Sequence, residues 1–304
     1  MKNILITGGT GTLGKELIRQ LHTKAEKIVV FSRDEQKQHK MMQEWPEGGE
    51  KGLRYFLGDI RDPGRLLTAL NDMDTVIHAA AMKHITFSEY NPGESIKTNI
   101  LGTMNVAEAC HKAGVRKAIF VSTDKACSPV NLYGACKKVG EKYWIAANNM
   151  GPCRFSVCRY GNVYGSNGSI IQAWEQSAIE GKPIRLTDPR MTRFWITVQD
   201  AAKFIIHKFS IMEGGETFVP LMASCSLTDM IKKIAPKCKI EDIGIRPGEK
   251  IHERLIDEAE NRRCYKYENE FFTLYPEYHA WTKDFTFIGE KVKEGFSYES
   301  NQAC

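Results

Sequence analysis

The sequence lacks a long apolar run and lacks closely spaced cysteines. No segment approaches the roughly 18 apolar residues that a membrane-spanning helix needs, and the N-terminus carries no basic and then apolar signal segment. The nine cysteines are scattered singly, without a Cys-x-x-Cys pair, which argues against a disulfide framework or a zinc site. The net charge of +5 contains no dense Lys/Arg run. We therefore expect a cytoplasmic protein with reduced thiols and with no membrane, nucleic-acid or metal partner.

What is present is an alternation of short β-branched apolar runs with longer helical segments, through the first half of the 304 residues. This alternation is typical of βαβ units that feed a parallel sheet. Six strands are expected, at residues 3–7, 27–32, 53–57, 75–79, 117–122 and 154–158. The sequence therefore predicts an α/β protein, a doubly wound parallel-sheet Rossmann fold with a smaller C-terminal substrate-binding region.

Beyond residue 162 the alternation loosens and Gly and Pro gather in clusters. No internal repeat, low-complexity segment or long linker divides the chain. We assign residues 1–162, together with about 191–213, to a cofactor-binding domain. Residues 163–190 and 214–304 are assigned to the substrate-binding region.

A glycine-rich turn follows the first expected strand directly and precedes a helix expected at residues 15–22. Gly8, Gly11 and Gly14 stand three residues apart in it. Glycines at this spacing let the backbone turn tightly and approach a pyrophosphate, while the helix N-terminus offers N–H donors. Because the turn lies between the first strand and the first helix, it predicts a dinucleotide site.

The end of the second strand indicates which dinucleotide is bound. An acidic residue directly there favours NAD, whereas Ser32 and Arg33 offer a hydroxyl and a guanidinium to the 2′-phosphate of NADP. Asp34 follows, and Lys37 adds a further charge one helical turn later. A plain ion pair of Arg33 is the alternative, and NADP is the preferred interpretation. The adenine and pyrophosphate edges are expected to be lined by residues that follow the third and fourth strands, namely Asp59, Ile60, Ala79, Ala80 and Ala81.

Tyr133 and Lys137 form a Tyr-x-x-x-Lys pair, whose spacing of four places both side chains on one helix face. An adjacent ammonium and a positive nicotinamide ring favour the tyrosine phenolate. Such a pair can deprotonate a sugar alcohol during hydride transfer. Its position after the fifth strand favours this function over that of a surface pair.

The fifth strand leads into Thr123, Asp124 and Lys125, and ligands bind at the carboxyl ends of parallel strands. Thr123 could hold the hydroxyl that is oxidised. A neighbouring acid and base imply a further proton transfer, as in 4,6-dehydration, where a base removes the C5 hydrogen and an acid protonates the departing C6 hydroxyl. We assign Lys125 as base and Asp124 as acid, with the roles exchangeable, and expect the pKa of Lys125 to be lowered. Phosphate binding by Lys125 and helix capping by Asp124 are the alternatives.

These residues lie in a chain that resembles bacterial inverting UDP-N-acetylglucosamine 4,6-dehydratases over nearly its whole length. The generic motifs are ILITGGTGTLGK and FSRDEQKQ, and further ones are HAAAMKHI, EYNPGESIKTNILGT and RYGNVYGSNGS. More specific are STDKACSPVNLYGACKK, DPRMTRFWIT and GIRPGEKIHE. The resemblance implies an enzyme, a hydro-lyase that uses tightly bound NADP recycled within each turnover.

The resemblance also implies roles for residues that match the family's motifs. Its catalytic set corresponds to Thr123, Asp124, Lys125, Tyr133 and Lys137. Its cofactor contacts, besides the glycines, correspond to Thr10, Thr12, Leu13, the segment from Ser32 to Lys37, Asp59, Ile60, Ala79, Lys83, Tyr133 and Lys137. Its UDP-sugar contacts correspond to Lys83, Asn162, Val163, Arg193, Arg246 and Glu249. Arg193 and Arg246 would also suit a diphosphate on chemical grounds, with surface ion pairs as the alternative.

Tyr133 distinguishes the chain from retaining relatives, which lack this tyrosine. The resemblance thus implies C5 inversion and a UDP-2-acetamido-2,6-dideoxy-β-L-arabino-hex-4-ulose product, as in pseudaminic acid biosynthesis. The chain departs from the family at Leu13, where Phe is usual, and at Cys127 and Cys136, where small or hydroxyl residues are usual. These departures bear on sugar preference and on redox sensitivity.

Two other functions are compatible with the fold. A UDP-sugar 4-epimerase shares the tyrosine and cofactor site but returns hydride to C4, and it has no use for Asp124 and Lys125. A non-catalytic NADP-binding sensor is the second, and the intact Tyr133 and Lys137 argue against it. A homo-oligomer, either a dimer or a hexamer, is expected by analogy alone.

Overall fold

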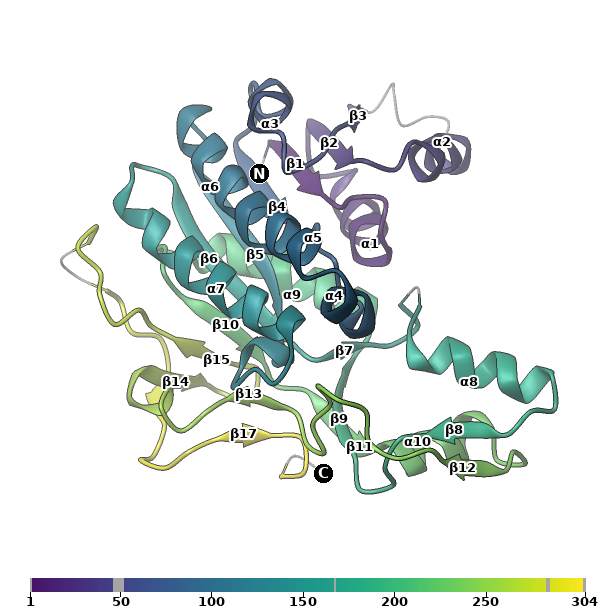
Figure 1. Ribbon diagram of the computed structural model, residues 1–304. Helices are drawn as coiled ribbons and strands as arrows, with labels where there is room; N and C mark the ends of the chain where they lie inside the picture. The colour runs from purple at the N-terminus through teal and green to yellow at the C-terminus, as the bar shows by residue number, and fades with distance from the viewer. Residues whose placement is uncertain (1, 46–51, 167, 283–284, 303–304) are drawn as a thin grey trace.

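A ten-stranded sheet runs through the centre of the molecule, with helices on both faces (Figure 1). The computed structural model describes residues 2–45, 52–166, 168–282 and 285–302. The strand order is β16-β14-β15-β10-β6-β5-β4-β1-β2-β3. In chain order these strands are β1 (Asn3–Thr7), β2 (Lys27–Ser32), β3 (Leu53–Leu57), β4 (Thr75–His78), β5 (Lys117–Thr123), β6 (Arg154–Tyr160), β10 (Thr217–Pro220), β14 (Cys264–Tyr267), β15 (Phe271–Leu274) and β16 (Glu290–Lys291).

The part of the sheet from β3 to β10 is parallel throughout. The remaining strands β15, β14 and β16 are antiparallel to their neighbours. All six predicted strands are confirmed. β4 ends one residue earlier than expected, at His78, whereas β5 and β6 continue to Thr123 and Tyr160.

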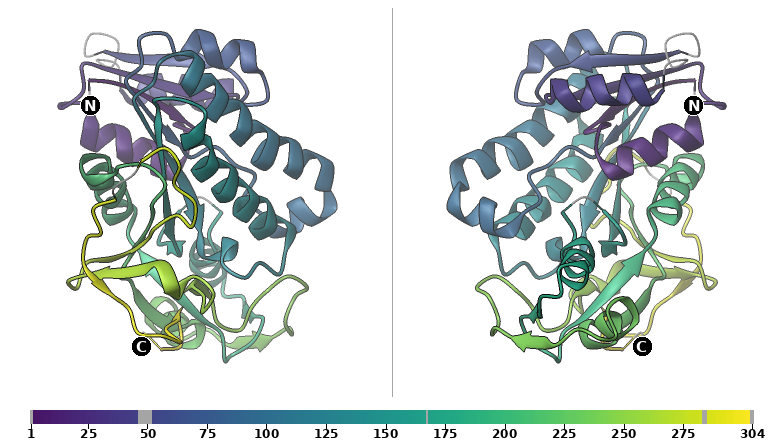
Figure 2. Two further views of the ribbon diagram at one scale, coloured as in Figure 1. Left: turned by 90° about the vertical axis from the view of Figure 1, so that its left-hand side faces the viewer. Right: turned by 90° about the vertical axis from the view of Figure 1, so that its right-hand side faces the viewer.

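Alternate residues of the central strands feed two separate apolar cores. On one face Ile4 and Ile6 pack with α1 (Thr12–Leu21), α2 (Glu35–Glu44) and α9 (Val198–Ile211). On the other face Leu5 packs with the core of α3 (Pro63–Ala69), α6 (Gly102–Lys112) and α7 (Leu132–Ala146). Figure 2 shows the sheet between these helical layers. Burial on both faces explains the continuous apolar character of these strands, and the doubly wound fold is confirmed.

Short helical segments connect the strands on the α7 side. They are α4 (Ile85–Tyr90), α5 (Pro92–Ile96), a π-helical turn η2 (Lys97–Leu101), and the 3₁₀ turns η3 (Asp124–Ala126), η4 (Ala147–Asn149) and η5 (Asn261–Arg263). The turn η3 is the one that matters most for chemistry. It begins where β5 ends, at the carboxyl edge of the parallel sheet.

A smaller part of the molecule lies beyond that carboxyl edge. It contains the three-stranded sheet of β11 (Ala223–Ser226), β9 (Thr192–Ile196) and β7 (Asn162–Val163). Helices α8 (Ile170–Ile179) and α10 (Leu227–Ile234) enclose a separate apolar core with Trp174 and Met191. Two further strand pairs complete it, namely β8 (Ile184–Leu186) with β12 (Ile240–Asp242), and β13 (Arg254–Ile256) with β17 (Tyr298–Glu299).

The domain boundary drawn from the sequence does not follow the central sheet. Strands β10, β14, β15 and β16 lie within residues 214–304, yet they extend the sheet of the cofactor-binding part. The reason is that β15 is buried along its whole length and pairs with β10. A short apolar run can be predicted to form a strand, but its sequence does not indicate to which sheet that strand belongs.

Cysteines and helix lengths agree with an ordinary globular interior. The eight cysteines within the described ranges are free thiols, and Cys304 lies outside the described residues. Among the residues that the structure describes, no helix has both the length and the apolar character needed to cross a membrane.

Candidate active site

The glycine-rich turn after β1 has the geometry of a phosphate-binding loop. Gly8 has a φ of +67°, and a Cβ on it would lie 2.9 Å from the backbone of Ala80. A Cβ on Gly14 would lie 2.4 Å from the carbonyl oxygen of Gly9. Gly11 is the N-cap of α1 and has no side chain to cover the helix N-terminus, the end of a helix that favours an anion. These features fit a dinucleotide pyrophosphate.

The residues after β2 form a polar edge beside this loop. The hydroxyls of Thr10 and Ser32 are 3.0 Å apart. Asp34 caps α2 by accepting from the Lys37 backbone N–H and pairs with the Lys37 ammonium at 2.7 Å, which lowers the pKa of Asp34. Arg33 is largely exposed, 3.7 Å from Asp59. Arg33 therefore remains the more available cation at this edge.

Asp59 and Ile60 follow β3 in different environments. Asp59 pairs with Arg61 at 2.7 Å, and although burial opposes the shift, hydrogen bonds from Arg61 lower its pKa. Ile60 is buried in the core beneath Gly102, so its side chain does not face solvent. Burial lowers the pKa of Lys83. The structure thus places Asp59 at the surface of this edge and Ile60 below it.

A buried hydrogen-bond chain, missed by the sequence analysis, fixes Ala79 and Ala80. The Thr7 hydroxyl accepts from both of their backbone N–H groups and lies 2.7 Å from Nδ1 of His78. Nε2 of His78 lies 3.0 Å from the hydroxyl of Thr103. A polar His inside an apolar strand was the available signal. These hydrogen bonds hold the turn after β4 against the end of β1, where the glycine-rich loop begins.

The segment after β5 brings three of the predicted catalytic residues together. Thr123 caps η3, and its hydroxyl donates to Oδ1 of Asp124 over 2.8 Å. The Lys125 ammonium donates to the same oxygen over 3.0 Å. Asp124 is fully buried, and its Oδ2 has no hydrogen-bond partner among the described residues. The turn therefore presents a buried acid and an amine side by side.

The expected lowering of the Lys125 pKa is wrong for this structure. Burial does disfavour the ammonium, but the carboxylates of Asp124 and Glu253 outweigh it and raise the pKa. Oε1 of Glu253 lies 3.4 Å from the Lys125 ammonium. The sequence analysis missed Glu253, although it ends the quoted motif GIRPGEKIHE.

Tyr133 and Lys137 lie on α7 as predicted, but their side chains have different partners. Burial raises the pKa of Tyr133 to about 12, Lys125 and a hydrogen bond with Thr123 oppose this, and Asp124 adds to it. The Lys137 ammonium donates to the carbonyl oxygen of Val121 over 2.7 Å. Burial lowers its pKa to about 7. The cation that favours the Tyr133 phenolate in this structure is therefore Lys125, and not Lys137 as the spacing suggested.

The predicted substrate contacts fall into two groups. Oδ1 of Asn162 lies 3.5 Å from the Lys125 ammonium, and Val163 follows it on β7, so both border the catalytic turn. Arg193 is buried and donates to the carbonyl oxygens of Thr192, Lys250 and Ile251.

Arg246 and Glu249, two further predicted substrate contacts, lie on the loop that precedes Lys250. Arg246 is exposed, and its backbone N–H donates to the Glu249 carboxylate. The Asn131 amide donates to the carbonyl oxygen of Gly248, which attaches this loop to the start of α7. The structure thus holds the loop next to the catalytic turn, with the Arg246 side chain available to a ligand.

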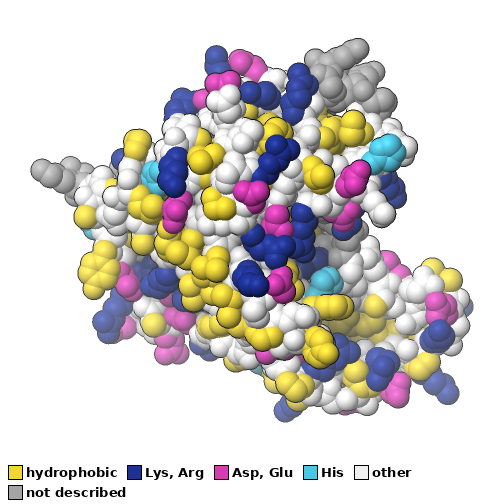
Figure 3. Space-filling view, turned by 45° about the horizontal axis from the view of Figure 1, so that its top comes forward, with side chains coloured by type: hydrophobic (Ala, Val, Ile, Leu, Met, Phe, Trp, Pro, Cys, Tyr) yellow, Lys and Arg dark blue, Asp and Glu magenta, His cyan; other side chains and the backbone are white. Residues whose placement is uncertain are grey.

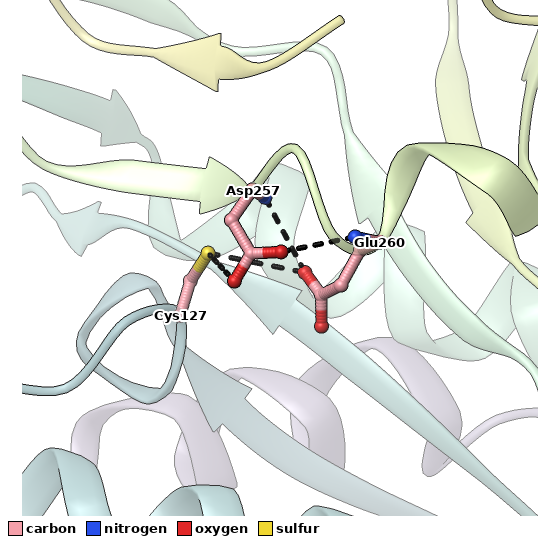
Figure 4. Close-up of side chains that lie close together, drawn as sticks. All are labelled: Cys127, Asp257 and Glu260. Carbon is pink, nitrogen blue, oxygen red and sulfur yellow. Dashed lines mark hydrogen bonds between the residues drawn. The ribbon is translucent and has the colours of Figure 1, made fainter. Parts of the chain in front are cut away.

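Cys127 lies beside Asp257 and Glu260, with the three ligand-type atoms within 4.8 Å of one another (Figure 4). Glu260 is already paired with Arg159 and Lys138 at 2.7 and 2.8 Å, so positive charge occupies the position that a metal would need. Burial raises the pKa of the Cys127 thiol to about 12, and burial also raises the pKa of the Cys136 thiol above its usual value. Both thiols therefore stay protonated, and the expected redox sensitivity has no support in their environment.

A buried ion cluster, also missed, joins the catalytic helix to the sheet and the C-terminal part. Arg159 on β6 pairs with Glu141 of α7 and with Glu260, each at 2.7 Å. Glu141 also accepts from the Ser122 hydroxyl at the end of β5. A single charged residue in an apolar strand gives no sequence signal of its partners.

The fold, the glycine-rich loop and the Tyr133–Lys137 pair define an enzyme of the extended short-chain dehydrogenase type. A family model described as "Polysaccharide biosynthesis protein" matches residues 4–274, and the chain belongs to this family.

Two known proteins are especially similar. The chain is 47% identical to the inverting UDP-N-acetylglucosamine 4,6-dehydratase of Campylobacter jejuni, over 99% of this chain and 92% of that protein. The solved structure of Pen from Bacillus thuringiensis is 36% identical with a TM-score of 0.91, and covers 100% of this chain and 95% of its own.

A third comparison concerns the fold alone. A dTDP-glucose 4,6-dehydratase from Streptomyces venezuelae, solved with NAD bound, is 21% identical with a TM-score of 0.74 over 82% of this chain and 86% of its own. The comparison confirms the Rossmann-like architecture derived above.

Replacing Gly14 with alanine tests the loop. We expect Gly14→Ala to weaken dinucleotide binding at least ten-fold, because the added Cβ would push Gly9 and open the turn. Cofactor titration by fluorescence measures this. Gly64→Ala is the control, since its Cβ meets only an ordinary contact at 3.5 Å. Equal affinity in the two variants would contradict the loop assignment.

Proposed function

We propose that this chain is a C5-inverting UDP-N-acetylglucosamine 4,6-dehydratase. The observation that carries the proposal is the pair formed by the buried Asp124 and the partly buried Lys125, within the same site as Thr123 and Tyr133. The likeness to the Campylobacter jejuni enzyme, over nearly all of both chains, supports the same reaction.

The first step is oxidation at C4 of the sugar. Tyr133 accepts the proton of the C4 hydroxyl, and the hydroxyl of Thr123 orients it. NADP, when bound, would supply the hydride acceptor for C4 and the hydride donor for C6, with a proton returning to C5 on the face that gives inversion. The Lys125 ammonium near Tyr133 stabilises the phenolate against the effect of burial.

The second step is elimination of water. The C4 ketone acidifies the C5 hydrogen, Lys125 as an amine removes it, and Asp124 as an acid protonates the departing C6 hydroxyl. The pair of a neutral Lys125 amine and a protonated Asp124 has the same total number of protons as the observed pair of ammonium and carboxylate. The reactive state therefore needs only one proton to move from Lys125 to Asp124, across the 3.0 Å contact.

The competing functions leave this pair unexplained. A UDP-sugar 4-epimerase needs the tyrosine, the hydroxyl and the cofactor, but no acid and base beyond them. A non-catalytic sensor would have no need of a buried carboxylate with an unpaired oxygen, which destabilises a fold. The dehydratase uses every one of these groups.

The proposal includes the finer assignments. The cofactor is NADP, with Arg33 and Ser32 at its 2′-phosphate. Asn162, Val163, Arg246 and Glu249 contact the UDP-sugar within the region beyond the carboxyl edge of the sheet. In Figure 3 a hollow lies there, with basic and histidine side chains at its rim.

A homo-oligomer is also part of the proposal. Phe87 and Tyr90 on α4 are 66% and 86% exposed, and Val139 on the neighbouring α7 is 47% exposed. Apolar side chains gather on this side of the molecule (Figure 3). Exposed apolar patches on helices support association with a second copy. A place in pseudaminic acid biosynthesis and in the cytoplasm stays a prediction.

Incubation of the purified protein with UDP-N-acetylglucosamine tests the reaction. We expect loss of the mass of one water, a C6 methyl doublet in the proton NMR spectrum, and ring couplings that report inversion at C5. An unchanged mass with a galacto-configured sugar would identify an epimerase instead.

Replacing Lys125 with alanine tests the base. We expect Lys125→Ala to reduce dehydration at least 100-fold, because C5 deprotonation loses its acceptor, while slow oxidation at C4 continues. Nucleotide absorbance and mass spectrometry separate the two steps. Lys142→Ala, on the exposed side of α7, is the control. Dehydration at the wild-type rate in Lys125→Ala would refute the assignment.

Arg33→Ala tests the cofactor. We expect roughly ten- to hundred-fold weaker binding of NADP and little change for NAD, because only the 2′-phosphate loses a charged donor. Titration calorimetry of both dinucleotides measures the ratio, with the exposed Arg116→Ala as control. A parallel loss for both dinucleotides would contradict recognition of the 2′-phosphate.

A further inference from the structure

Glu253 is a buried carboxylate that no step described above uses. It is 3% exposed and lies directly before β13. Its backbone N–H donates to the Ser300 hydroxyl, and its carbonyl accepts from the Ser300 N–H. The backbone is thus fixed between the catalytic turn and the C-terminal segment. The side chain is aimed at Lys125, with Oε1 3.4 Å from the ammonium.

Three cations surround the Glu253 carboxylate. Besides Lys125, the Lys250 ammonium lies 3.8 Å from Oε2, and Nε of Arg193 lies 4.0 Å from Oε1. Asp124 faces Lys125 from its other side. Tyr133 is the remaining titratable group that Lys125 influences.

The two other cations have firm hydrogen bonds of their own. The Lys250 ammonium donates to the carbonyl oxygen of Cys127 over 2.6 Å. The guanidinium of Arg193 donates to three backbone carbonyls. Oε2 of Glu253 has no hydrogen-bond partner among the described residues. A buried acceptor without a donor destabilises a fold, so a purely structural role explains Glu253 poorly.

We propose that Glu253 is a positioning residue that holds the amino group of Lys125 in place and stabilises the ammonium formed when Lys125 takes the C5 proton. This inference rests on the proposed dehydratase. It assigns to Glu253 the role of the third group that orients a base and stabilises its protonated form.

The electrostatics have a definite sign. Burial works against the Lys125 ammonium, while Asp124 and Glu253 raise its pKa. Removing one carboxylate lowers that pKa, so the neutral amine becomes more abundant at a given pH and also becomes a weaker base. The first consequence lowers the pH at which the Asp124–Lys125 pair loses its shared proton, and the second lowers the plateau of the rate. A loss of folded protein cannot produce this pattern.

Glu253→Gln keeps the shape of the side chain and removes its charge. We expect the descending limb of the kcat/KM profile, where the Asp124–Lys125 pair loses its shared proton, to move to lower pH by about one unit or more, and the plateau to fall roughly ten-fold. Glu253→Asp should restore most of the wild-type profile because the carboxylate is retained. The exposed Glu258→Gln, just after β13, is the control.

Trace acylation followed by peptide mass spectrometry tests the charge coupling without any substrate. At one mildly alkaline pH, we expect labelling of Lys125 relative to Lys142 to rise roughly ten-fold in Glu253→Gln, because one pKa unit changes the amine fraction ten-fold. Thermal unfolding verifies that each variant is folded.

The outcomes separate the two proposals. Unchanged labelling of Lys125 in folded Glu253→Gln overturns the role of Glu253, whatever the enzyme does. A plateau that falls without any shift of the limb also overturns it. Increased labelling together with a wild-type protein that dehydrates no UDP-N-acetylglucosamine would uphold the coupling and refute the proposed reaction.

Discussion

The buried guanidinium of Arg159 is the contact on which the arrangement of the site depends. It bonds Glu141 on the catalytic helix, Glu260 after β13 and the carbonyl oxygen of Leu255 within β13. Glu141 in turn holds Ser122, at the end of the strand that leads into η3. Removing one partner of such a cluster leaves an uncompensated buried charge, which costs about 3–5 kcal/mol. The cluster therefore fixes the positions of β5, β6, α7 and the segment around β13 relative to one another.

The site contains the buried Lys137 and the partly buried Lys125, whose environments differ in charge. Lys137 faces a backbone carbonyl and the ring of Phe120, and burial lowers its pKa to about 7. Lys125 faces two carboxylates, which raise its pKa. Nearby carboxylates outweigh burial at Lys125, whereas burial dominates at Lys137, so the same side chain has two proton affinities. In the proposed reaction the stronger base is the one that lies beside the acid Asp124.

The sequence predicted what depends on local order along the chain. The six parallel strands, the glycine-rich loop and the turn that contains Asp124 and Lys125 each follow from residues that are neighbours in sequence. The direction of the Lys125 pKa was predicted wrongly because the carboxylate of Asp124 raises it and Glu253, which only the folded chain brings near, raises it further. The Arg159 cluster and the antiparallel strands β14 to β16 were missed for the same reason.

The C-terminal part contributes side chains to the turn after β5 and to the neighbouring strand β6. It supplies Glu253 to Lys125, the Lys250 ammonium to the carbonyl of Cys127, and Glu260 to Arg159. Each of these contacts joins the turn after β5, or the strand beside it, to residues more than a hundred positions later. A parallel sheet alone can place an acid and an amine at its carboxyl edge, whereas the second carboxylate that faces the amine comes from the C-terminal part. In the proposed reaction, the second part of the chain thus completes the environment of the base.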